Sequence, residues 1–291
     1  MNAEFSHLKA FVAVVDEGSF TDAAASLDVS QAAVSRGVAA LERAIGAKVL
    51  RRTTREVGLT PAGARLIGPA RRVLADMALI AGIAGHVSSE LRVGYAWAAL
   101  GRHTTGVQQR WADEFPGSEL VFVQSMTATA GLAEGSVDVA VLRRPVSDER
   151  MASALVGVEQ RFAALATSDP LARRRSLTLN DFSGRVVGID DRTGTTTPDL
   201  WPTHAAPSAT RMVRGVEDWL TLIAAGQAIG MTSEATFHQH PRPGVKFRPV
   251  RDAQPIPLWL AWRRDDPPER VETLVQLVCE AYGAHPGASG R

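Results

Sequence analysis

The chain has 291 residues, of which 45% are hydrophobic, and this is enough for two or three compact units that each bury a core. The 32 basic and 31 acidic residues nearly cancel, which excludes a chain that is strongly basic or acidic throughout. Cys279 is the only cysteine, so an intramolecular disulfide is excluded. We expect a cytoplasmic protein without a membrane partner, because the lone thiol suits a reducing compartment, no secretory signal is present, and no apolar run approaches the roughly 20 residues of a membrane span.

Two short amphipathic helices are predicted before residue 30. The first is capped by Ser6 and carries its apolar side chains on one face. The same spacing recurs over residues 20–27, in a helix opened by Thr21 or Asp22. A connection as tight as Asp28-Val29 between this helix and the next is typical of a helix-turn-helix.

The third predicted helix runs from Ser30 to Gly46, and both of its ends are marked. Ser30 can accept hydrogen bonds from the first turn, and Gly46 can adopt the left-handed conformation that ends a helix. Helical spacing predicts a buried stripe of Val34, Val38, Leu41 and Ile45. The opposite face carries Gln31, Ala32, Ser35, Arg36, Ala39 and Arg43. A face this short, polar and basic can approach a major groove closely, although an ordinary amphipathic surface helix is the alternative.

A basic hairpin is predicted directly after this helix. Two short strands flank a polar turn that carries Arg55, which could enter a minor groove, whereas Arg51 and Arg52 suit phosphates. Between residues 30 and 75, nine basic residues outnumber two acidic ones, so the positive charge is local. A solvated hairpin without a DNA contact is the alternative.

A long helix is predicted to follow, because Thr60-Pro61 is a strong helix start. Its apolar residues alternate four and three apart, as in a coiled-coil seam. These residues are Leu66, Ala70, Val73, Met77, Ile80 and Ala84. We interpret residues 61–88 as a linker and dimerisation helix, kinked at Pro69. A helix packed against its own C-terminal domain is the alternative.

From residue 89, strands alternate with helices, which predicts an α/β domain with a largely parallel sheet. Chain order predicts two subdomains, the first of about 90–162 with 264–291 and the second of about 163–263. Ligands are expected beyond the carboxyl ends of the strands. The loops after the first two strands carry Ala96, Trp97, Ala98, Ser125, Met126 and Thr127. Their N–H groups and hydroxyls could bind a carboxylate, with Trp97 either a stacking wall or a structural residue.

The run over residues 11–63 resembles the N-terminal domain of LysR-type transcriptional regulators. The resemblance rests on the GSF, AA, SQ-AVS, LE, G, R and LTPAG elements. The chain departs from the family pattern at Val49-Leu50-Arg51 and at Ala32, where proline is frequent. By this resemblance the residues that face DNA are Gln31, Ala32, Ser35 and Arg36, with Arg55 in the wing.

The rest of the chain resembles the effector domain of the same family, which is similar to type 2 periplasmic binding proteins. The motifs LRVG, F-P, G-VDVAV and AG-AIGM carry this resemblance. It implies effector contacts in the two loops named above and, after the strand at Val139, Arg143 as an anion partner. It also implies a dimer that assembles into a homotetramer, double-stranded promoter DNA as partner, and RNA polymerase as a further candidate partner.

No catalytic arrangement is recognisable, since the sequence lacks a nucleophile elbow, a P-loop and a dinucleotide-binding turn. Apart from the pair His238-Gln239-His240 in an expected loop, the seven histidines do not form a metal-binding spacing, so we expect no metal, no cofactor and no enzymatic activity. The expected architecture is a winged helix-turn-helix over residues 1–60, the linker helix, and a regulatory α/β domain over 89–291. The predicted function is a sequence-specific transcriptional regulator controlled by an acidic or aromatic small molecule. The alternative is a periplasmic-binding-protein-like binding protein or enzyme without a DNA role.

Overall fold

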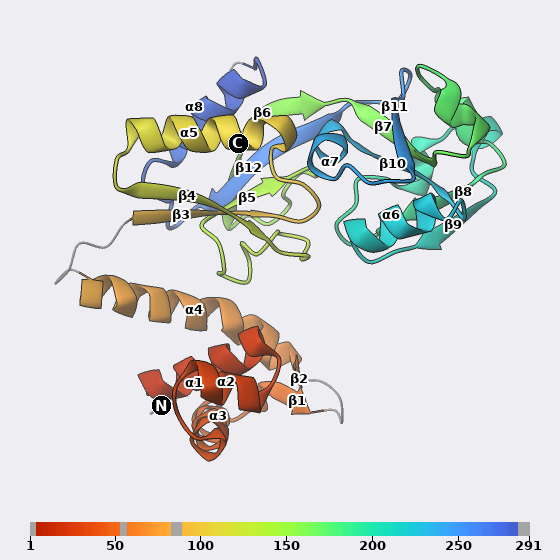
Figure 1. Ribbon diagram of the computed structural model, residues 1–291. Helices are drawn as coiled ribbons and strands as arrows, with labels where there is room; N and C mark the ends of the chain where they lie inside the picture. The colour runs from red at the N-terminus through yellow and green to blue at the C-terminus, as the bar shows by residue number, and fades with distance from the viewer. Residues whose placement is uncertain (1–3, 53–56, 83–88, 285–291) are drawn as a thin grey trace. The chain divides into compact units, whose positions relative to one another are not determined.

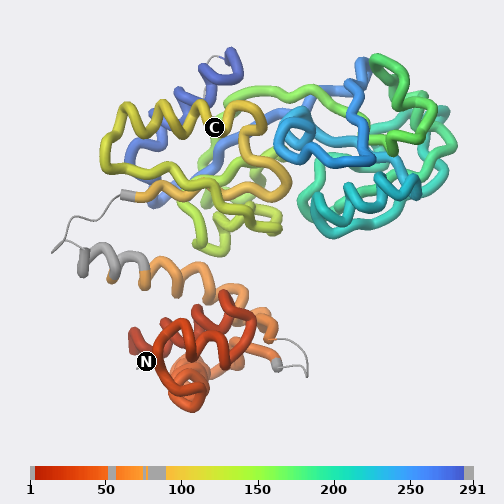
Figure 2. The backbone as a smooth tube through the Cα atoms, viewed as in Figure 1, coloured from red at the N-terminus to blue at the C-terminus, as the bar shows by residue number. Residues whose placement is uncertain are grey.

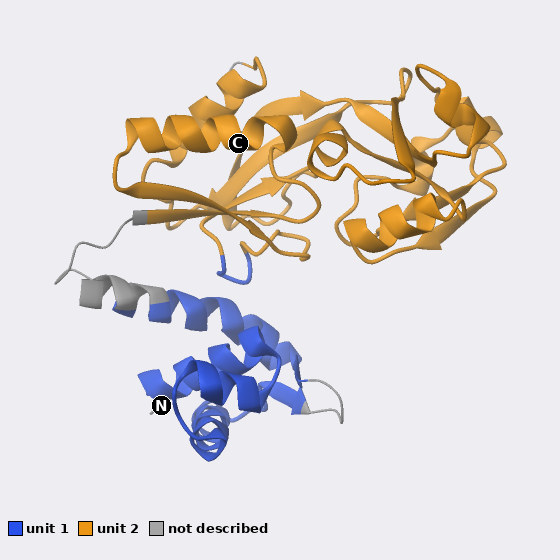
Figure 3. Cartoon of the chain, in the orientation of Figure 1, with its two compact units in different colours: residues 1–88, 133–136 blue, residues 89–132, 137–291 orange. Residues whose placement is uncertain are grey.

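The computed structural model describes residues 4–52, 57–82 and 89–284. The chain divides into two compact units, residues 1–88 with 133–136 and residues 89–132 with 137–291 (Figure 3). Each unit has its own hydrophobic core. The expected combination of a winged helix-turn-helix with an α/β domain is confirmed (Figure 1).

The first unit consists of helices and one two-stranded ribbon. Its elements are α1 (Phe5–Glu17), α2 (Phe20–Ser26), α3 (Gln31–Ile45), β1 (Leu50–Arg52), β2 (Val57–Leu59) and α4 (Pro61–Gly82). Phe11, Val34 and Leu41 are among the side chains that bring α1 and α3 together in the core. Strands β1 and β2 pair antiparallel and form the base of the predicted wing.

Two helix starts differ from the prediction. Helix α1 is preceded by Glu4, whose backbone N–H donates to His7 Nδ1 at 3.2 Å, so Ser6 lies within the helix rather than capping it. Helix α2 begins at Phe20, because Ser19 Oγ accepts the N–H of Asp22 at 3.0 Å. The side chain of Asp22 therefore belongs to the first turn of α2 and does not open the helix.

The buried stripe of α3 is also shifted at its end. Ile45 is 36% exposed, and Glu42 is buried instead. Its carboxylate accepts hydrogen bonds from Lys48 Nζ at 2.6 Å and from the backbone N–H of Val49 at 3.1 Å. Although burial raises the pKa of Glu42, these hydrogen bonds outweigh it and hold the pKa below its usual range. Glu42 thus fastens the end of the helix to the start of the wing.

Helix α4 is continuous through Pro69, and its apolar face is divided between two environments. Ile67 and Ala70 are buried in the core of the first unit. In contrast, Val73 and Met77 are 44% and 43% exposed. Ile80 has no described side chain, and Ala84 lies outside the described residues. The first half of the predicted seam therefore serves the core of its own unit.

The second unit contains two five-stranded sheets. Figure 1 draws their strands as arrows, and Figure 2 shows the path of the backbone through them. The first has the order β4-β3-β5-β12-β6 and the second β11-β7-β10-β8-β9. The first comprises β3 (Ser89–Tyr95), β4 (Ser118–Gln124), β5 (Val139–Leu142), β6 (Met151–Glu159) and β12 (Ile256–Arg263). The second comprises β7 (Arg161–Ala166), β8 (Val186–Ile189), β9 (Ala209–Met212), β10 (Ile229–Ser233) and β11 (Val245–Pro249). We call the two sheets with their helices the first and second lobes.

Helices cover these sheets because their strands are buried and apolar. In the first lobe, α5 (Thr104–Glu114) and α8 (Val271–Ala281) contact each other and share a core with Val93 and Leu258. In the second lobe, α6 (Val216–Ala224) and α7 (Glu234–Gln239) pack near Phe247. Short 3-10 helices occupy Gly101–His103, Pro170–Arg173, Leu179–Phe182, Pro198–Leu200 and Thr203–Ala205. No helix in the described part of the chain is both long and apolar enough to cross a membrane.

Two details of the sheets correct the prediction. Each sheet combines two parallel with two antiparallel strand pairs, so neither is largely parallel. Strand β12 lies in the first sheet between β5 and β6, although the sequence assigned residues 163–263 to the second subdomain. An isolated strand of the composition IPLWLAWR fits either buried sheet, because its partner is set by chain topology. The chain thus crosses between the lobes just after β6 and just before β12.

Candidate functional site

The outer face of α3 is the first candidate site. Gln31, Ala32 and Arg36 are exposed, whereas Ser35 is partly buried. Ser30 Oγ accepts the N–H of Ala33 at 3.2 Å, as expected of a helix cap. The predicted residues therefore lie together at the N-terminal end of one helix, where small side chains allow a close approach to another surface.

A close contact between α3 and α1 fixes which face of α3 points outward. A Cβ atom on Gly37 would lie 3.0 Å from the Cβ of Ala10, so the two helices approach at this point. The side chains of Val34 and Leu41 are buried on the same side of α3. The polar face is thus directed away from the core by the packing of the apolar one.

The wing carries a second set of predicted residues. Arg51 is exposed and pairs with Gly58 in the β1–β2 ribbon, where an added Cβ would meet Arg51 Nε at 2.9 Å. Arg52 pairs with Val57 at the end of the ribbon. Arg55 lies outside the described residues. The structure therefore places the two strand arginines at the wing and leaves the role of its tip as a prediction.

The base of the wing is held by the start of α4. Thr60 Oγ1 donates to the carbonyl of Lys48 at 2.6 Å and accepts the N–H of Gly63 at 3.0 Å. A Cβ on Gly63 would lie 2.0 Å from the Val49 carbonyl oxygen, so no larger residue fits there without movement. The Thr-Pro-Ala-Gly element thus joins wing and helix, which accounts for its residue types in physical terms.

The second candidate site is a cavity of about 270 Å³ in the second unit. It is lined by the loops that follow β3, β4 and β5 in the first lobe and β8 in the second, so residues of both lobes contribute. Four of the predicted effector residues line it, namely Ala96, Trp97, Thr127 and Arg143. The other three predicted residues, Ala98, Ser125 and Met126, do not line it. The structure therefore brings together the ends of these four strands, but only part of the predicted set.

Trp97 combines the two roles considered for it. Its Nε1 donates to Asp190 Oδ2 at 3.2 Å and to Thr193 Oγ1 at 3.0 Å. Its ring meets Trp219 edge-on, with centroids 5.3 Å apart at 69°. Its carbonyl oxygen lies 2.8 Å from His240 Nε2. Trp97 is therefore both a wall of the cavity and a link from the first lobe to the second.

Asp190 was not predicted from the sequence, yet it is the centre of this link. Its carboxylate accepts the backbone N–H groups of Arg192, Thr193 and Gly215 in addition to the side chains of Thr193 and Trp97. Burial raises the pKa of Asp190, but these hydrogen bonds outweigh it and lower the pKa. An Asp directly after a strand and before Asp-Arg-Thr-Gly is a turn signal that could have identified this position.

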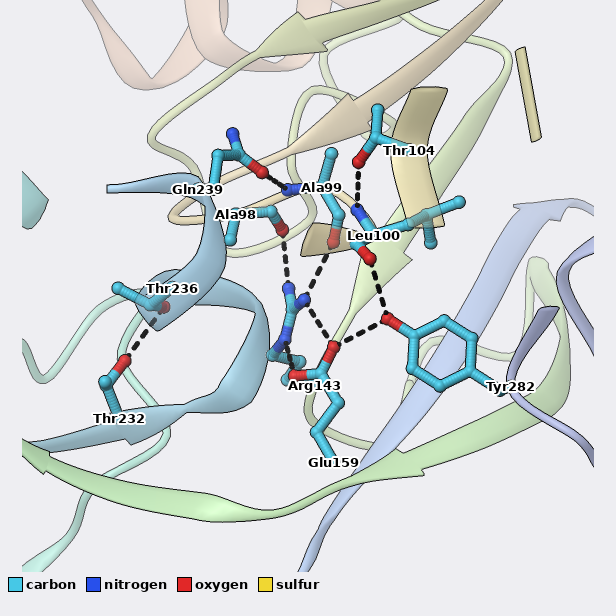
Figure 4. A network of polar contacts seen from close by, with 10 residues as sticks. All are labelled: Ala98, Ala99, Leu100, Thr104, Arg143, Glu159, Thr232, Thr236, Gln239 and Tyr282. Carbon is cyan, nitrogen blue, oxygen red and sulfur yellow. Dashed lines mark hydrogen bonds and ion pairs between the residues drawn. The ribbon is translucent and has the colours of Figure 1, made fainter. Parts of the chain in front are cut away.

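Arg143 belongs to a buried polar network (Figure 4). Its guanidinium donates to both carboxylate oxygens of Glu159, at 2.8 and 2.9 Å. Two further N–H groups donate to the carbonyls of Ala98 at 2.6 Å and Ala99 at 2.7 Å. The Tyr282 hydroxyl lies 2.9 Å from Glu159 Oε1. Four of the five N–H donors of Arg143 are thus used within the protein.

The charges of this network stabilise each other. Burial disfavours both ions, but Glu159 raises the pKa of Arg143, and Arg143 lowers the pKa of Glu159. Burial and the neighbouring Glu159 raise the pKa of Tyr282, so its hydroxyl stays protonated. Arg143 consequently shapes the loop at Ala98 and Ala99, and its geometry is explained without a bound anion. Among the described residues, no group of three or more His, Cys, Asp or Glu side chains could hold a metal ion.

Comparison with known proteins gives matches to both units. Residues 5–64 match the bacterial regulatory helix-turn-helix protein, lysR family, and residues 84–283 match the LysR substrate binding domain. The uncharacterized HTH-type transcriptional regulator YnfL of Escherichia coli (strain K12) is 29% identical, covering 90% of this chain and 93% of that protein. The HTH-type transcriptional regulator BenM of Acinetobacter baylyi is 26% identical, covering 96% of each. Full-length CbnR in complex with its target DNA has a similar fold, with a TM-score of 0.68, 22% identity, and coverage of 96% of this chain and 99% of that one.

Proposed function

The chain belongs to the LysR family of bacterial helix-turn-helix regulators, and we propose that it binds promoter DNA through α3 and the wing. A small-molecule effector would bind in the cavity of its second unit. The chain is a DNA-binding transcriptional regulator with an effector-binding domain rather than an enzyme. This membership favours the regulator over the alternative of a binding protein or enzyme without a DNA role.

The main observation in support of DNA recognition by α3 is that the side chain of Arg36 is exposed and has no hydrogen-bond or ion-pair partner among the described residues. Arg36 lies on the outer face of α3, and Gln31 and Ala32 are exposed beside it. An arginine with unused donors next to small side chains can form a bidentate contact with guanine in the major groove. Arg51, Arg52 and Arg55 would add contacts to phosphates and the minor groove.

The proposed function assigns a separate role to each of three segments of the chain. Residues 1–60 would bind double-stranded DNA, residues 61–88 would link and dimerise, and residues 89–291 would sense the effector. Val73 and Met77 are exposed on α4, and a second copy of the helix would cover them. We expect a dimer that pairs further into a homotetramer, in the cytoplasm, with RNA polymerase as a further partner.

The effector would bind where the loops of both lobes meet. A ligand held between two lobes shifts their relative arrangement by the difference in its affinity for each arrangement. In a dimer or tetramer such a shift would change the spacing of the recognition helices on DNA. The walls formed by Trp97 and Trp219 suit a compact ligand with a flat or apolar part.

Footprinting of the purified full-length protein on the region upstream of its own gene tests the proposed function. We expect a protected segment at protein concentrations that leave a scrambled fragment of equal length unprotected. Equal protection of both fragments would contradict sequence-specific recognition. Light scattering at micromolar concentration tests the assembly, and a monomer there would contradict the dimerisation role of α4.

A further inference from the structure

Two arginines that the sequence analysis did not single out line the cavity. Arg144 follows β5 in the first lobe, and Arg192 follows β8 in the second. They differ from Arg143, whose donors are used by Glu159 and two carbonyl oxygens. The guanidinium of Arg143 is therefore occupied by protein acceptors, whereas those of Arg144 and Arg192 have few hydrogen-bond partners.

Arg144 is the more buried of the two arginines, so a donor without a partner costs more there. Its Nη1 lies 3.5 Å from the carbonyl oxygen of Asp191, at the limit of a hydrogen bond. Its Nη2 is buried and has no hydrogen-bond partner among the described residues. Buried polar groups in proteins nearly always have a hydrogen-bond partner. Burying a cationic donor without an acceptor costs more free energy than burying a neutral donor without one. Arg144 thus lacks an acceptor at the wall of a cavity.

Arg192 lies next to the point that Arg144 reaches. Its backbone N–H donates to Asp190 Oδ1 at 3.0 Å, which fixes the turn, while its side chain makes no hydrogen bond or ion pair with any described residue. The guanidinium of Arg144, from the first lobe, therefore reaches the backbone directly before Arg192, in the second lobe. Both arginines line the same cavity, and the side chain of Arg192 is exposed.

The acidic residues that line the cavity have their carboxylate oxygens occupied by other partners. Asp190 already accepts five hydrogen bonds from its own turn, Gly215 and Trp97. Asp148 is held by Arg150, which donates through Nη2 at 2.6 Å and through its backbone N–H at 3.0 Å. The oxygens of both carboxylates are therefore occupied by donors of the protein itself, whereas the guanidinium groups of Arg144 and Arg192 still have donors that no described residue uses.

From these contacts we propose that the cavity binds a compact anion, a carboxylate or phosphate, clamped between Arg144 of the first lobe and Arg192 of the second, with its remaining part against Trp97 and Trp219. This rests on the proposed effector role of the cavity and names the chemical class of its ligand. Guanidinium groups match the oxygens of both anions in a bidentate geometry. A volume of about 270 Å³ lies at the small end for ligand cavities, which favours a small acid over a nucleotide.

Melting curves and calorimetric titrations of the full-length protein provide the test. The probes are succinate, benzoate and inorganic phosphate, each at up to 10 mM as a condition of the experiment, with succinamide and benzamide as neutral counterparts. We expect at least one anion to raise the melting temperature and its amide not to. Binding of a carboxylate alone, or of phosphate alone, identifies which of the two anions the clamp accepts.

Variants of the clamp connect the binding to these residues. Arg144→Gln and Arg192→Gln should each weaken the binding anion about tenfold or more, whereas Arg144→Lys should retain part of the affinity. Arg173→Gln is the control, because Arg173 is an exposed arginine of the second lobe outside the cavity lining. The melting temperature of each variant without ligand shows whether it is folded, and Arg144→Lys keeps the test valid if the glutamine variant is not.

Three results would overturn the clamp: no response to any of the anions, equal responses to acid and amide, or unchanged affinity in both glutamine variants. The footprint of the wild-type protein separates this failure from failure of the proposed function. Specific protection of DNA together with any of these results refutes the anion clamp alone. Absence of specific protection refutes the regulator function whatever the anions do.

Discussion

The indole Nε1 of Trp97 donates to Asp190 Oδ2 across the two lobes, at 3.2 Å. Trp97 follows β3 in the first lobe, and Asp190 follows β8 in the second. Both residues line the cavity, so any ligand there lies next to a hydrogen bond that joins the lobes. A change in the Trp97–Asp190 hydrogen bond would therefore alter the wall of the cavity.

We predict that Trp97→Phe destabilises the second unit by about 1–3 kcal/mol, because Asp190 loses a donor while it stays buried. Denaturant unfolding measures this loss. Trp259→Phe is the matched control, since the buried Nε1 of Trp259 has no hydrogen-bond partner in the described part of the chain and its removal breaks no hydrogen bond there. Equal destabilisation by the two substitutions would mean that ring volume, rather than the Asp190 bond, matters at Trp97.

The buried pair of Arg143 and Glu159 predicts a larger effect. Glu159→Gln preserves the shape but leaves the Arg143 cation without its counter-charge, and breaking a buried pair in this way typically costs about 3–5 kcal/mol. The free energy of unfolding is the measurement. Glu280→Gln removes the surface pair with Arg110 and should change little. A loss at Glu159 no larger than at Glu280 would contradict the structural role of the network.

The same network predicts how stability depends on pH. The pKa of Glu159 is lowered in the folded protein, so its ionised form stabilises the fold above the unfolded pKa of about 4.3. This stabilisation is fully present at neutral pH and is lost as the pH falls through the lower, folded pKa. Unfolding curves below pH 4.3 should therefore be less steep in pH for Glu159→Gln than for the wild type. Identical pH dependence of the two proteins would refute this assignment.

The contact of Gly63 with the wing gives a prediction for the first unit. Gly63→Ala would place Cβ 2.0 Å from the Val49 carbonyl oxygen, so backbone must move, at a cost of about 1–3 kcal/mol. Gly106→Ala is the control, because Gly106 is an exposed residue in the first turn of α5 and its Cβ would meet nothing within 4 Å. That change should stabilise the protein by roughly 0.5–1 kcal/mol. Thermal unfolding of both variants distinguishes a steric effect from a general effect of replacing glycine.

Local signals explain why much of the first unit was predictable from the sequence. Ser30 and Gly46 cap α3 as expected, because caps depend on neighbouring residues alone. Ile45 was wrongly expected to be buried, and the burial of Glu42 was not predicted, since a buried carboxylate needs Lys48 and Val49 from the next segment to become favourable. Spacing along a helix cannot indicate such a partner.

In the second unit, the features that the sequence did not predict also depend on contacts between distant parts of the chain. Arg143 was expected near the ligand because the family resemblance places effector contacts after the strand at Val139. Its partner Glu159 is on another strand, however, and this ion pair uses the donors that an anion would need. Asp190 became recognisable only once Trp97 was brought to it by the crossing of the chain between lobes. The position of the cavity could thus be predicted from the ends of the strands, whereas the partners of its charged side chains could be identified only from the folded structure.

The final prediction concerns DNA recognition by Arg36. Arg36→Ala should weaken binding to the protected upstream segment by about 1–3 kcal/mol if Arg36 reads a base, and should reduce discrimination against scrambled DNA. Arg43→Ala is the matched control on the same helix, because Arg43 lies at its C-terminal end and donates from Nε to the Ala39 carbonyl at 3.3 Å. Gel-shift titrations of both DNAs at several salt concentrations separate the mechanisms. An even loss of affinity with a shallower salt slope would assign Arg36 to a phosphate, and unchanged binding to both DNAs would refute its contact with DNA.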